Sequence, residues 1–366
     1  MSQTKQGPND DRQMPRPPHL PPVAIWAIVL GMALIAAMVV FRVDTWGDRG
    51  SGLSPRFEFD VSELVAVDPD LVSHSETAQV PVGMQSVQAI AATSDGRFLV
   101  AGDRAVQIFQ ADGTMAQAFS VPDEPRCLAV AGDDHDFPGR IYVGLASRVE
   151  VFDASGQPIA TWSEGLDQNT LLTSLAVFED NVLAADAGNR VVVRWDATGR
   201  LLGTIGEPDA QRGIDGFVIP SEHFDIVVPT DGVLRVVNPG AQRIEAFTLD
   251  GSPLGHWGEA SARIEGFFGC CNPSHLTVLA DGRFVTSEKG LPRVKLYSPQ
   301  GEFESVIAAT ALLTNRGGGP EIRDEHSSRT FGVAADSTGR VLVLDPNTRQ
   351  VRIFEPLESG AVGDAG

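Results

Sequence analysis

Cysteine and histidine side chains suggest the most specific chemistry in this chain. Cys270 and Cys271 are adjacent and precede His275 in the stretch FFGCCNPSH. When the short inner strands of the repeats described below are aligned on their apolar residues, Cys127, His223 and His275 fall at the same first position. Thiolate and imidazole are common ligands of zinc and copper. We therefore predict Cys127, His223 and His275 as metal ligands near the mouth of a central channel.

Other chemistries fit the same cysteines. The sequence has no CxxC or HxH pair, and adjacent cysteines do not easily bind one ion together. A Cys270–Cys271 disulfide, a bridge from Cys127 to one of them, buried inert thiols, and a redox or copper-handling pair are the alternatives.

Polar side chains on the hairpins that should border the channel mouth are candidate ligand contacts. With the loop residues Cys270, Cys271 and His275, the predicted ligand-binding set includes four hairpin residues: Glu288, Lys289, Asp186 and Asn189. Calcium is a further candidate cofactor, because AGDDHDFPGR (residues 131–140) is rich in aspartate, although the segment lacks the DxDxDG spacing and closing glutamate of a calcium loop. No nucleophile elbow, P-loop or dinucleotide fingerprint is present.

A repeat that recurs six times must position these residues. Its regular mark is an aromatic residue followed four positions later by glycine, as in Phe109/Gly113 and Phe152/Gly156. The aromatic residue ends an alternating run such as RVEVFD, which predicts a half-buried strand. A more apolar strand and a short inner strand precede that run, and an outer strand follows the glycine. Four strands in each of six units predict an all-β, six-bladed β-propeller.

The repeat register also predicts how the ring closes. The last unit lacks its outer strand, because only a short acidic tail follows Phe354. A spare segment, ETAQVPV (residues 76–82), precedes the first inner strand. Pairing this N-terminal strand with QVRIFEP would complete the last blade and leave no open edge.

The units resemble NHL repeats, in which each blade carries a pattern close to DGxxYVAD…NxRVxxF…G. NVLAADAGNRVVVRWDATG (residues 181–199) is the nearest match, and DGRFVTSEKGLPRVKLYSPQG (residues 281–301) is another. The resemblance covers residues 76–357 and implies a propeller of the kind used as binding platforms, scaffolds and a few enzymes. The alpha-amidating lyases are similar six-bladed propellers with metal in the channel. They use several channel histidines, and only His223 and His275 align with such positions here.

One arginine recurs before each aromatic strand: Arg104, Arg148, Arg190, Arg243, Arg293 and Arg349. A ring of arginines could grip an anionic ligand. Recurrence in every blade instead favours a structural role that fixes each hairpin, with a polar residue closing the preceding strand as its partner.

The N-terminal segments predict a membrane anchor. Residues 1–22 form a polar, proline-rich, disordered tail. Residues 23–41 carry no charge, which predicts one transmembrane helix rather than a cleaved signal peptide. Residues 42–75 form a linker with a possible short helix, and residues 358–366 form a flexible tail. We expect the propeller on the extracytoplasmic (periplasmic) side of the cell membrane, although flanking basic residues do not decide the orientation.

The net charge of −20, from 48 acidic and 28 basic residues, argues against nucleic acid as a partner. The sequence predicts a module that binds a small molecule or a protein through the face carrying Cys270 and Cys271. The alternative is a metal-dependent lyase or hydrolase, or a metal or redox accessory protein, so enzymatic activity remains open.

Overall fold

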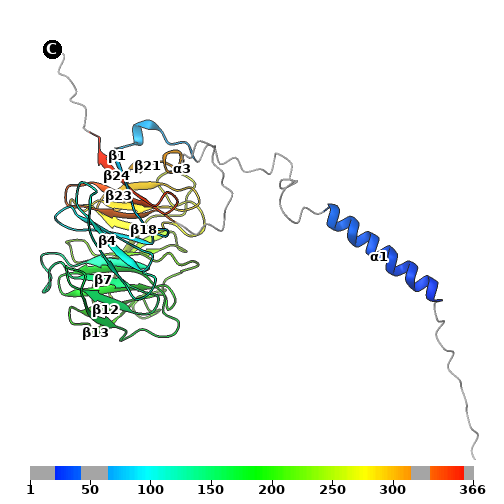
Figure 1. Ribbon diagram of the computed structural model, residues 1–366, viewed down its shortest axis with the longest axis horizontal. Coiled ribbons are helices and arrows are strands. Elements are labelled where there is room, and N and C mark those ends of the chain that lie inside the picture. The colour runs from blue at the N-terminus through cyan, green and yellow to red at the C-terminus, as the bar shows by residue number, and fades with distance from the viewer. Residues whose placement is uncertain (1–20, 43–64, 315–329, 358–366) are drawn as a thin grey trace, which may run out of the picture. The chain divides into compact units, whose positions relative to one another are not determined.

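The computed structural model describes residues 21–42, 65–314 and 330–357 (Figure 1). The chain divides into two units, residues 1–60 and 61–366. Most of the predicted tail at 1–22, most of the linker at 42–75 and the tail at 358–366 lie outside the described residues. Within the predicted linker, the structure shows a 3-10 turn, η2 (Pro69–Leu71).

The first unit contributes α1 (Pro22–Arg42), over the segment for which the sequence predicts a transmembrane helix. Within the ranges that the structure describes, no helix combines the length and the apolar character that crossing a bilayer requires. The predicted transmembrane helix is therefore not supported.

The second unit is an all-β propeller with six four-stranded sheets in the part of the chain that the structure describes. Blades 1 to 3 hold β2 (Ala89–Ala92), β3 (Phe98–Gly102), β4 (Ala105–Phe109), β5 (Met115–Ser120); β6 (Cys127–Val130), β7 (Ile141–Gly144), β8 (Val149–Phe152), β9 (Pro158–Trp162); and β10 (Leu172–Phe178), β11 (Asn181–Asp186), β12 (Val191–Asp196), β13 (Leu201–Ile205). Blades 4 and 5 hold β14 (Ile226–Val227), β15 (Leu234–Asn238), β16 (Arg243–Phe247), β17 (Pro253–Trp257); and β18 (His275–Val278), β19 (Phe284–Ser287), β20 (Val294–Tyr297), β21 (Phe303–Ala308). Blade 6 holds β22 (Gly332–Ala335), β23 (Val341–Asp345), β24 (Gln350–Pro356) and the N-terminal β1 (His74–Pro81), and a short helix, α3 (Thr310–Thr314), follows blade 5.

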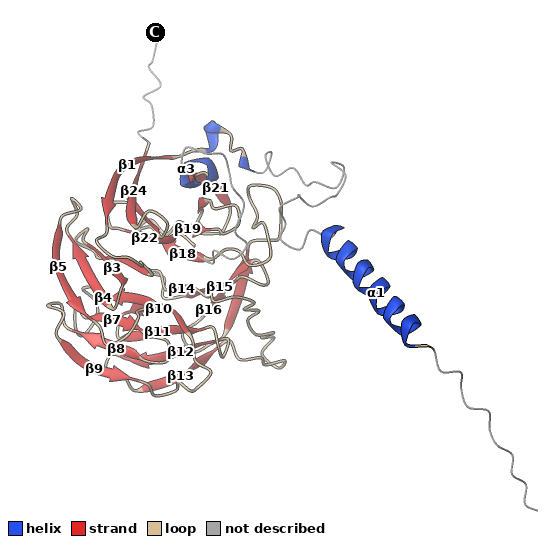
Figure 2. Ribbon diagram, turned by 45° about the vertical axis from the view of Figure 1, so that its right-hand side comes forward, coloured by secondary structure: helices blue, strands red, loops and turns tan. Residues whose placement is uncertain are grey.

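The inner strands form a ring. Each contacts its neighbours in the cyclic order β2, β6, β10, β14, β18, β22 and back to β2. Figure 2 shows the outer strands β5, β9 and β13 at the rim, with β14 and β18 near the centre. Blades 2 and 5 therefore lie opposite each other across the ring.

The predicted closure of the ring is confirmed. β1 pairs with β24 in an antiparallel sheet, with Glu76 opposite Phe354 and Val80 opposite Val351. The strand begins at His74, two residues before the predicted segment. Arg352 donates two hydrogen bonds to the Glu76 carboxylate, at 2.9 and 2.6 Å, which adds a partly buried ion pair to the closing contact.

The recurrent glycine has a steric cause. Gly301 has a φ of +85°, and a Cβ there would lie 2.3 Å from Cγ of Trp257, on the outer strand of the preceding blade. Gly156 repeats this arrangement against Phe119. The glycine thus allows a turn in the left-handed region and a close approach between blades.

The recurrent arginines have mostly structural contacts, but their partners differ. Arg293 bonds to Glu288, the residue that closes the preceding strand, as predicted. Arg148 and Arg243 instead bond to a glutamate two residues further along their own strands, and Arg349 reaches a glutamine side chain. Asp345 accepts backbone N–H groups of its own hairpin, as Asp186 does.

Blade 5 contains a buried ion cluster. Glu288 lies 2.6 Å from a guanidinium nitrogen of Arg293 and 2.5 Å from Nζ of Lys295, and all three side chains are at most 1% exposed. Lys295 also donates to the carbonyl of Gly266 at 2.7 Å. Burial lowers the pKa of Lys295 to about 8, while Glu288 opposes the shift. The cluster ties the segment that leads to Cys270 to the core of the blade.

Candidate functional site

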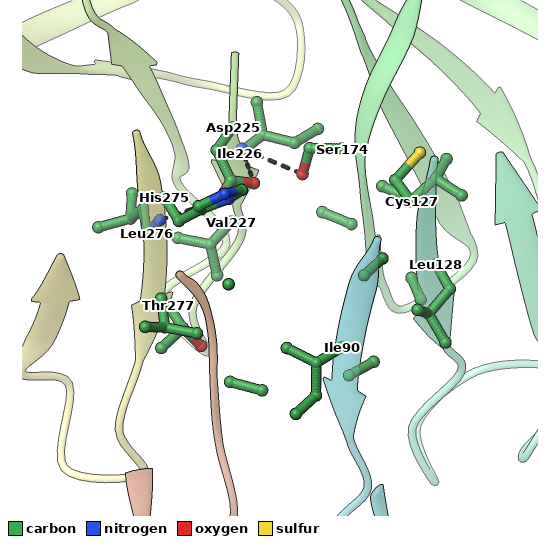
Figure 3. Close-up of a pocket in the computed structure, with 18 of the residues that line it drawn as sticks. Ile90, Cys127, Leu128, Ser174, Asp225, Ile226, Val227, His275, Leu276 and Thr277 are labelled. Atoms are coloured by element: carbon green, nitrogen blue, oxygen red, sulfur yellow. Dashed lines mark hydrogen bonds and ion pairs between the residues drawn. The ribbon is translucent and has the colours of Figure 1, made fainter. Parts of the chain in front are cut away.

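A pocket of about 220 Å³ lies along the axis of the ring, lined by all six inner strands (Figure 3). Most of its wall is alanine, valine, isoleucine and leucine. Its polar side chains cluster where the inner strands begin, and they include Arg126, Ser174, Asp225 and His275. We call this end of the pocket the channel mouth.

The strand register changes one of the residues predicted at the mouth. His275 pairs with Ser287, Cys127 with Gly144 and Ser174 with Ala185, and these three partners occupy the same position in the second strands of their blades. In blade 4 the equivalent residue of that strand, Val237, donates its N–H to the carbonyl of Asp225. Asp225, and not His223, is therefore the counterpart of His275. The predicted alignment was wrong by two residues in blade 4, because a shift of two preserves the alternation of apolar side chains.

Asp225 and Thr330 hold the His275 ring from both sides. Nδ1 of His275 lies 3.3 Å from Oδ2 of Asp225, and Nε2 lies 2.6 Å from the Thr330 hydroxyl oxygen. The same carboxylate oxygen accepts the N–H of Leu276 at 2.9 Å, which fixes its position. The acidic partner favours a proton on Nδ1, so Nε2 accepts the hydrogen bond from Thr330.

His223 lies beside His275, on the segment that enters blade 4. The two ring centroids are 6.1 Å apart at an interplanar angle of 71°. Burial, together with the neighbouring His275 and Lys289, lowers the pKa of His223 to about 3. His223 is therefore a neutral imidazole at neutral pH, able to donate one hydrogen bond and accept another.

Two cationic side chains flank the imidazole pair from different blades. Lys289, on the β19–β20 hairpin, donates from Nζ to the Ser221 hydroxyl at 3.3 Å. Arg126, directly before β6, pairs with Glu222 and donates to the carbonyl of Leu172 at 3.3 Å. The segment 221–223 thus runs between a cation of blade 2 and a cation of blade 5.

The loop before β18 carries two free thiols. Cys270 is exposed and Cys271 is buried, and the Cys271 thiol contacts the Cys270 sulfur at 3.3 Å. Asn272 anchors the loop, because its side chain accepts the N–H of Lys289 at 2.8 Å and donates to the carbonyl of Lys289 at 2.9 Å. All three cysteines of the chain are free, so neither of the alternative disulfides is present in the structure.

Cys127 lines the same pocket but lies on β6, opposite β18 in the ring (Figure 3). Its sulfur packs against Gly144, where a Cβ would lie 2.3 Å away, and the residue belongs to the core between blades 2 and 3. Burial raises the pKa of its thiol to about 12. Cys127 is thus a packed, protonated thiol, and the structure does not bring it together with His223 and His275.

Three of the predicted hairpin contacts are engaged within the protein. Asp186 accepts five hydrogen bonds from its own blade, including two from Asn189, and Asn189 also donates to Asp167. Glu288 belongs to the buried ion cluster. Lys289 instead reaches the neighbouring segment that enters blade 4, through its contact with Ser221. The ligand role of all four hairpin residues stays a prediction.

Among the residues that the structure describes, no group of three or more histidine, cysteine, aspartate or glutamate side chains could hold a metal ion. The zinc, copper or calcium predicted from the sequence therefore remains a prediction. Sequence reasoning missed Asp225 and Arg126 and did not anticipate the contact of Thr330. An acidic residue at the start of an inner strand was the available signal for Asp225.

No family model matches the chain, and no curated protein matches it. Among solved structures, it is similar to a catalytically inactive histidine-to-alanine variant of virginiamycin B lyase from Staphylococcus aureus, determined with quinupristin. The two proteins are 12% identical over 76% of this chain and 83% of that chain, with a TM-score of 0.50. This similarity supports the propeller fold alone. Membership of the NHL family stays a prediction.

Proposed function

We propose that this chain is a binding module whose propeller takes a small ligand with an anionic group at the channel mouth. The observation that carries the proposal is the imidazole pair His223 and His275 between two cations, Lys289 and Arg126. Lys289, Arg126 and the one N–H of His223 supply hydrogen-bond donors there, in a chain whose net charge is −20. A strongly acidic protein attracts few anions, so a local pair of cations would supply both attraction and orientation.

The size and lining of the pocket favour a small ligand. At about 220 Å³ it is smaller than the usual range for drug-sized molecules. Apolar walls below a polar mouth suit a molecule with an anionic head and a short apolar body. The hydrogen bonds that hold His275 and the Asn272 loop before a ligand arrives would reduce the ordering cost of binding.

Titration calorimetry on the full chain tests this proposal with acetate, butyrate and inorganic phosphate as probes and glycerol as the neutral control. We expect Lys289→Met and Arg126→Met each to weaken binding of the preferred anion roughly 10-fold or more, because each removes a charged hydrogen-bond donor. Arg200→Met is the matched control, since Arg200 is an exposed arginine on a different turn. Equal affinity in all variants, or no binding of any anion, would refute the proposed site.

An acid–base enzyme is the second candidate, favoured by the Asp225–His275–Thr330 arrangement. A carboxylate at Nδ1 orients an imidazole and stabilises its protonated form, and Nε2 then exchanges a proton with an O–H group. A substrate hydroxyl or water that displaced Thr330 would meet a positioned base. The fold similarity to a lyase is compatible with this candidate and does not establish it.

Whether the protein chemically changes the ligand that it binds distinguishes the enzyme from the binding module. For an enzyme, His275→Gln and Asp225→Asn should lower kcat by about 100-fold or more while binding persists. Thr330→Val should change the pH profile of kcat, and Thr330→Ser, which restores a hydroxyl, should restore it. If the ligand is chemically unaltered after long incubation, the result favours the binding module over the enzyme.

The extracytoplasmic location remains a prediction from the sequence. An alkaline phosphatase fused to the C-terminus tests it, since that enzyme needs the disulfide-permitting compartment. A well-expressed but inactive fusion would count against export.

A further inference from the structure

We propose that Cys270 and Cys271 form a two-thiol chelating site for thiophilic trivalent arsenic, either arsenite or a monosubstituted arsenical. The site lies on the loop before β18, and the two sulfur atoms are 3.3 Å apart. The inference does not rest on the anion-binding proposal, because neither thiol belongs to the imidazole and cation set at the mouth.

The donor set selects against zinc. Structural zinc takes four ligands, and the described residues offer no third histidine, cysteine or carboxylate to this pair. Two thiolates on one tetrahedral zinc, with bonds of about 2.3 Å, are roughly 3.8 Å apart. The observed separation of 3.3 Å is shorter. It suits two sulfurs on one pyramidal, three-coordinate atom with a narrower angle at its centre.

The two thiols differ in access. Cys270 is exposed, so a ligand can reach it first. Cys271 is only 6% exposed and lies beside Ser221 and Lys289. Burial and the contact with Cys270 raise the pKa of the Cys271 thiol, so it stays protonated at neutral pH. An arsenic hydroxyl group removes that proton as water, whereas binding a zinc ion requires the thiolate.

The loop holds the pair in place on both sides. Gln242 donates from Nε2 to the carbonyls of Phe267 and Gly269, at 2.9 and 2.5 Å. After the pair, Asn272 bonds to Lys289 in both directions, and the N–H of Ser274 donates to a β19 carbonyl. A fixed dithiol loses little conformational entropy when both sulfurs bind one atom.

The chemistry balances without an oxidant. Hydrated phenylarsine oxide carries two hydroxyl groups on trivalent arsenic. Two As–S bonds form with Cys270 and Cys271, two As–O bonds break, and each thiol proton leaves with a hydroxyl group as water. Arsenic stays trivalent and sulfur keeps its oxidation state.

Phenylarsine oxide titration of the reduced full chain tests the site, with intact mass and thiol counting as readouts. We expect one adduct per chain, loss of the reactive thiols of this loop, reversal by 2,3-dimercaptopropanol and resistance to 2-mercaptoethanol. Cys270→Ser and Cys271→Ser should each weaken binding about 100-fold or more, because the second sulfur binds intramolecularly.

Cys127→Ser is the control and should bind phenylarsine oxide as the natural chain does, since Cys127 is packed on the opposite strand. Cys270→Ser alters an exposed side chain, and circular dichroism with a melting curve shows that it folds. A Cys270→Ser variant that binds within about threefold of the natural chain would overturn the proposal, because chelation would then contribute nothing. A Cys270–Cys271 disulfide that persists in reductant would overturn it too.

Discussion

Acid should weaken the closure of the ring through His74, the first residue of β1. His74 is 4% exposed, and its Nδ1 lies 2.8 Å from the Ser73 hydroxyl. Its Nε2 is buried with no hydrogen-bond partner among the described residues. Burial lowers the pKa of His74 to about 4, and Arg283 lowers it in the same direction. The folded protein therefore keeps this imidazole neutral in a pH range where the unfolded chain binds a proton.

The sign and size of the effect follow from linkage. Because the unfolded state binds more protons, the stability contributed by neutral His74 is present above its unfolded pKa of 6.5 and is lost as pH falls toward about 4. At about pH 5 the unfolded imidazole is nearly all protonated and the folded one only about one tenth. We expect His74 to reduce the free energy of unfolding by about 2 kcal/mol between about pH 7 and about pH 5.

Urea denaturation at the two pH values, on the natural chain and on His74→Asn, measures this effect. Asparagine keeps a polar partner for Ser73 but does not titrate. Any stability that the variant loses through poorer packing is therefore the same at both pH values and cancels in the comparison. The variant should lose about 2 kcal/mol less than the natural chain between them. His256→Asn is the control for replacing a histidine by asparagine, since His256 is exposed on β17. Equal losses in the natural chain and His74→Asn would refute the reasoning.

Three further changes test the packing of the blades, each by urea denaturation. Glu288→Gln leaves two buried cations without a counter-charge and should cost about 3–5 kcal/mol of unfolding free energy. A cost below about 1 kcal/mol would contradict the buried ion cluster. Gly301→Ala places a Cβ against Trp257 at a φ of +85° and should cost more than about 1 kcal/mol. Arg352→Met removes the partner of Glu76 from the closing sheet and should cost about 1.5–3 kcal/mol.

Matched variants separate these causes from general effects of substitution. Gly290→Ala has a similar positive φ with no atom within 4 Å of the added Cβ, so it should cost less than Gly301→Ala. Equal costs would mean that the contact with Trp257 is unimportant. Arg200→Met removes a largely exposed pair and should change stability by less than about 1 kcal/mol. A larger loss there than in Arg352→Met would contradict the assigned role of Arg352 in closure.

Most of the fold was predictable because the signal is local and repeated. Alternating apolar residues set each strand, and the aromatic residue and glycine recur because every blade packs on the one before it. The closing strand could be predicted from the number of strands in each repeat, because blade 6 lacked its outer strand and the N-terminal segment of β1 belonged to no other blade. The predicted transmembrane helix over residues 23–41 rested on composition alone and is not supported.

The site was less predictable because its contacts join distant parts of the chain. His275 contacts Asp225 and Thr330, which are 50 and 55 residues away in the sequence. These contacts depend on where along the ring axis the neighbouring inner strands begin. β14 has only two residues in its strand, too few for a pattern to fix the register. An alignment that is wrong by two residues keeps the same apolar side chains on the same face of the strand. The sequence alignment therefore placed His223 at the position that Asp225 occupies in the structure.

By itself, the sequence determined a propeller of six blades closed by its N-terminal strand, and it singled out the loop with Cys270, Cys271 and His275. Only the tertiary structure decided which of these groups meet. It sets Cys127 apart on the opposite strand, joins His275 to Asp225 and Thr330, and leaves the two neighbouring thiols free. Repeats determine strands because their physics is local, whereas a site depends on how separate blades align around one axis.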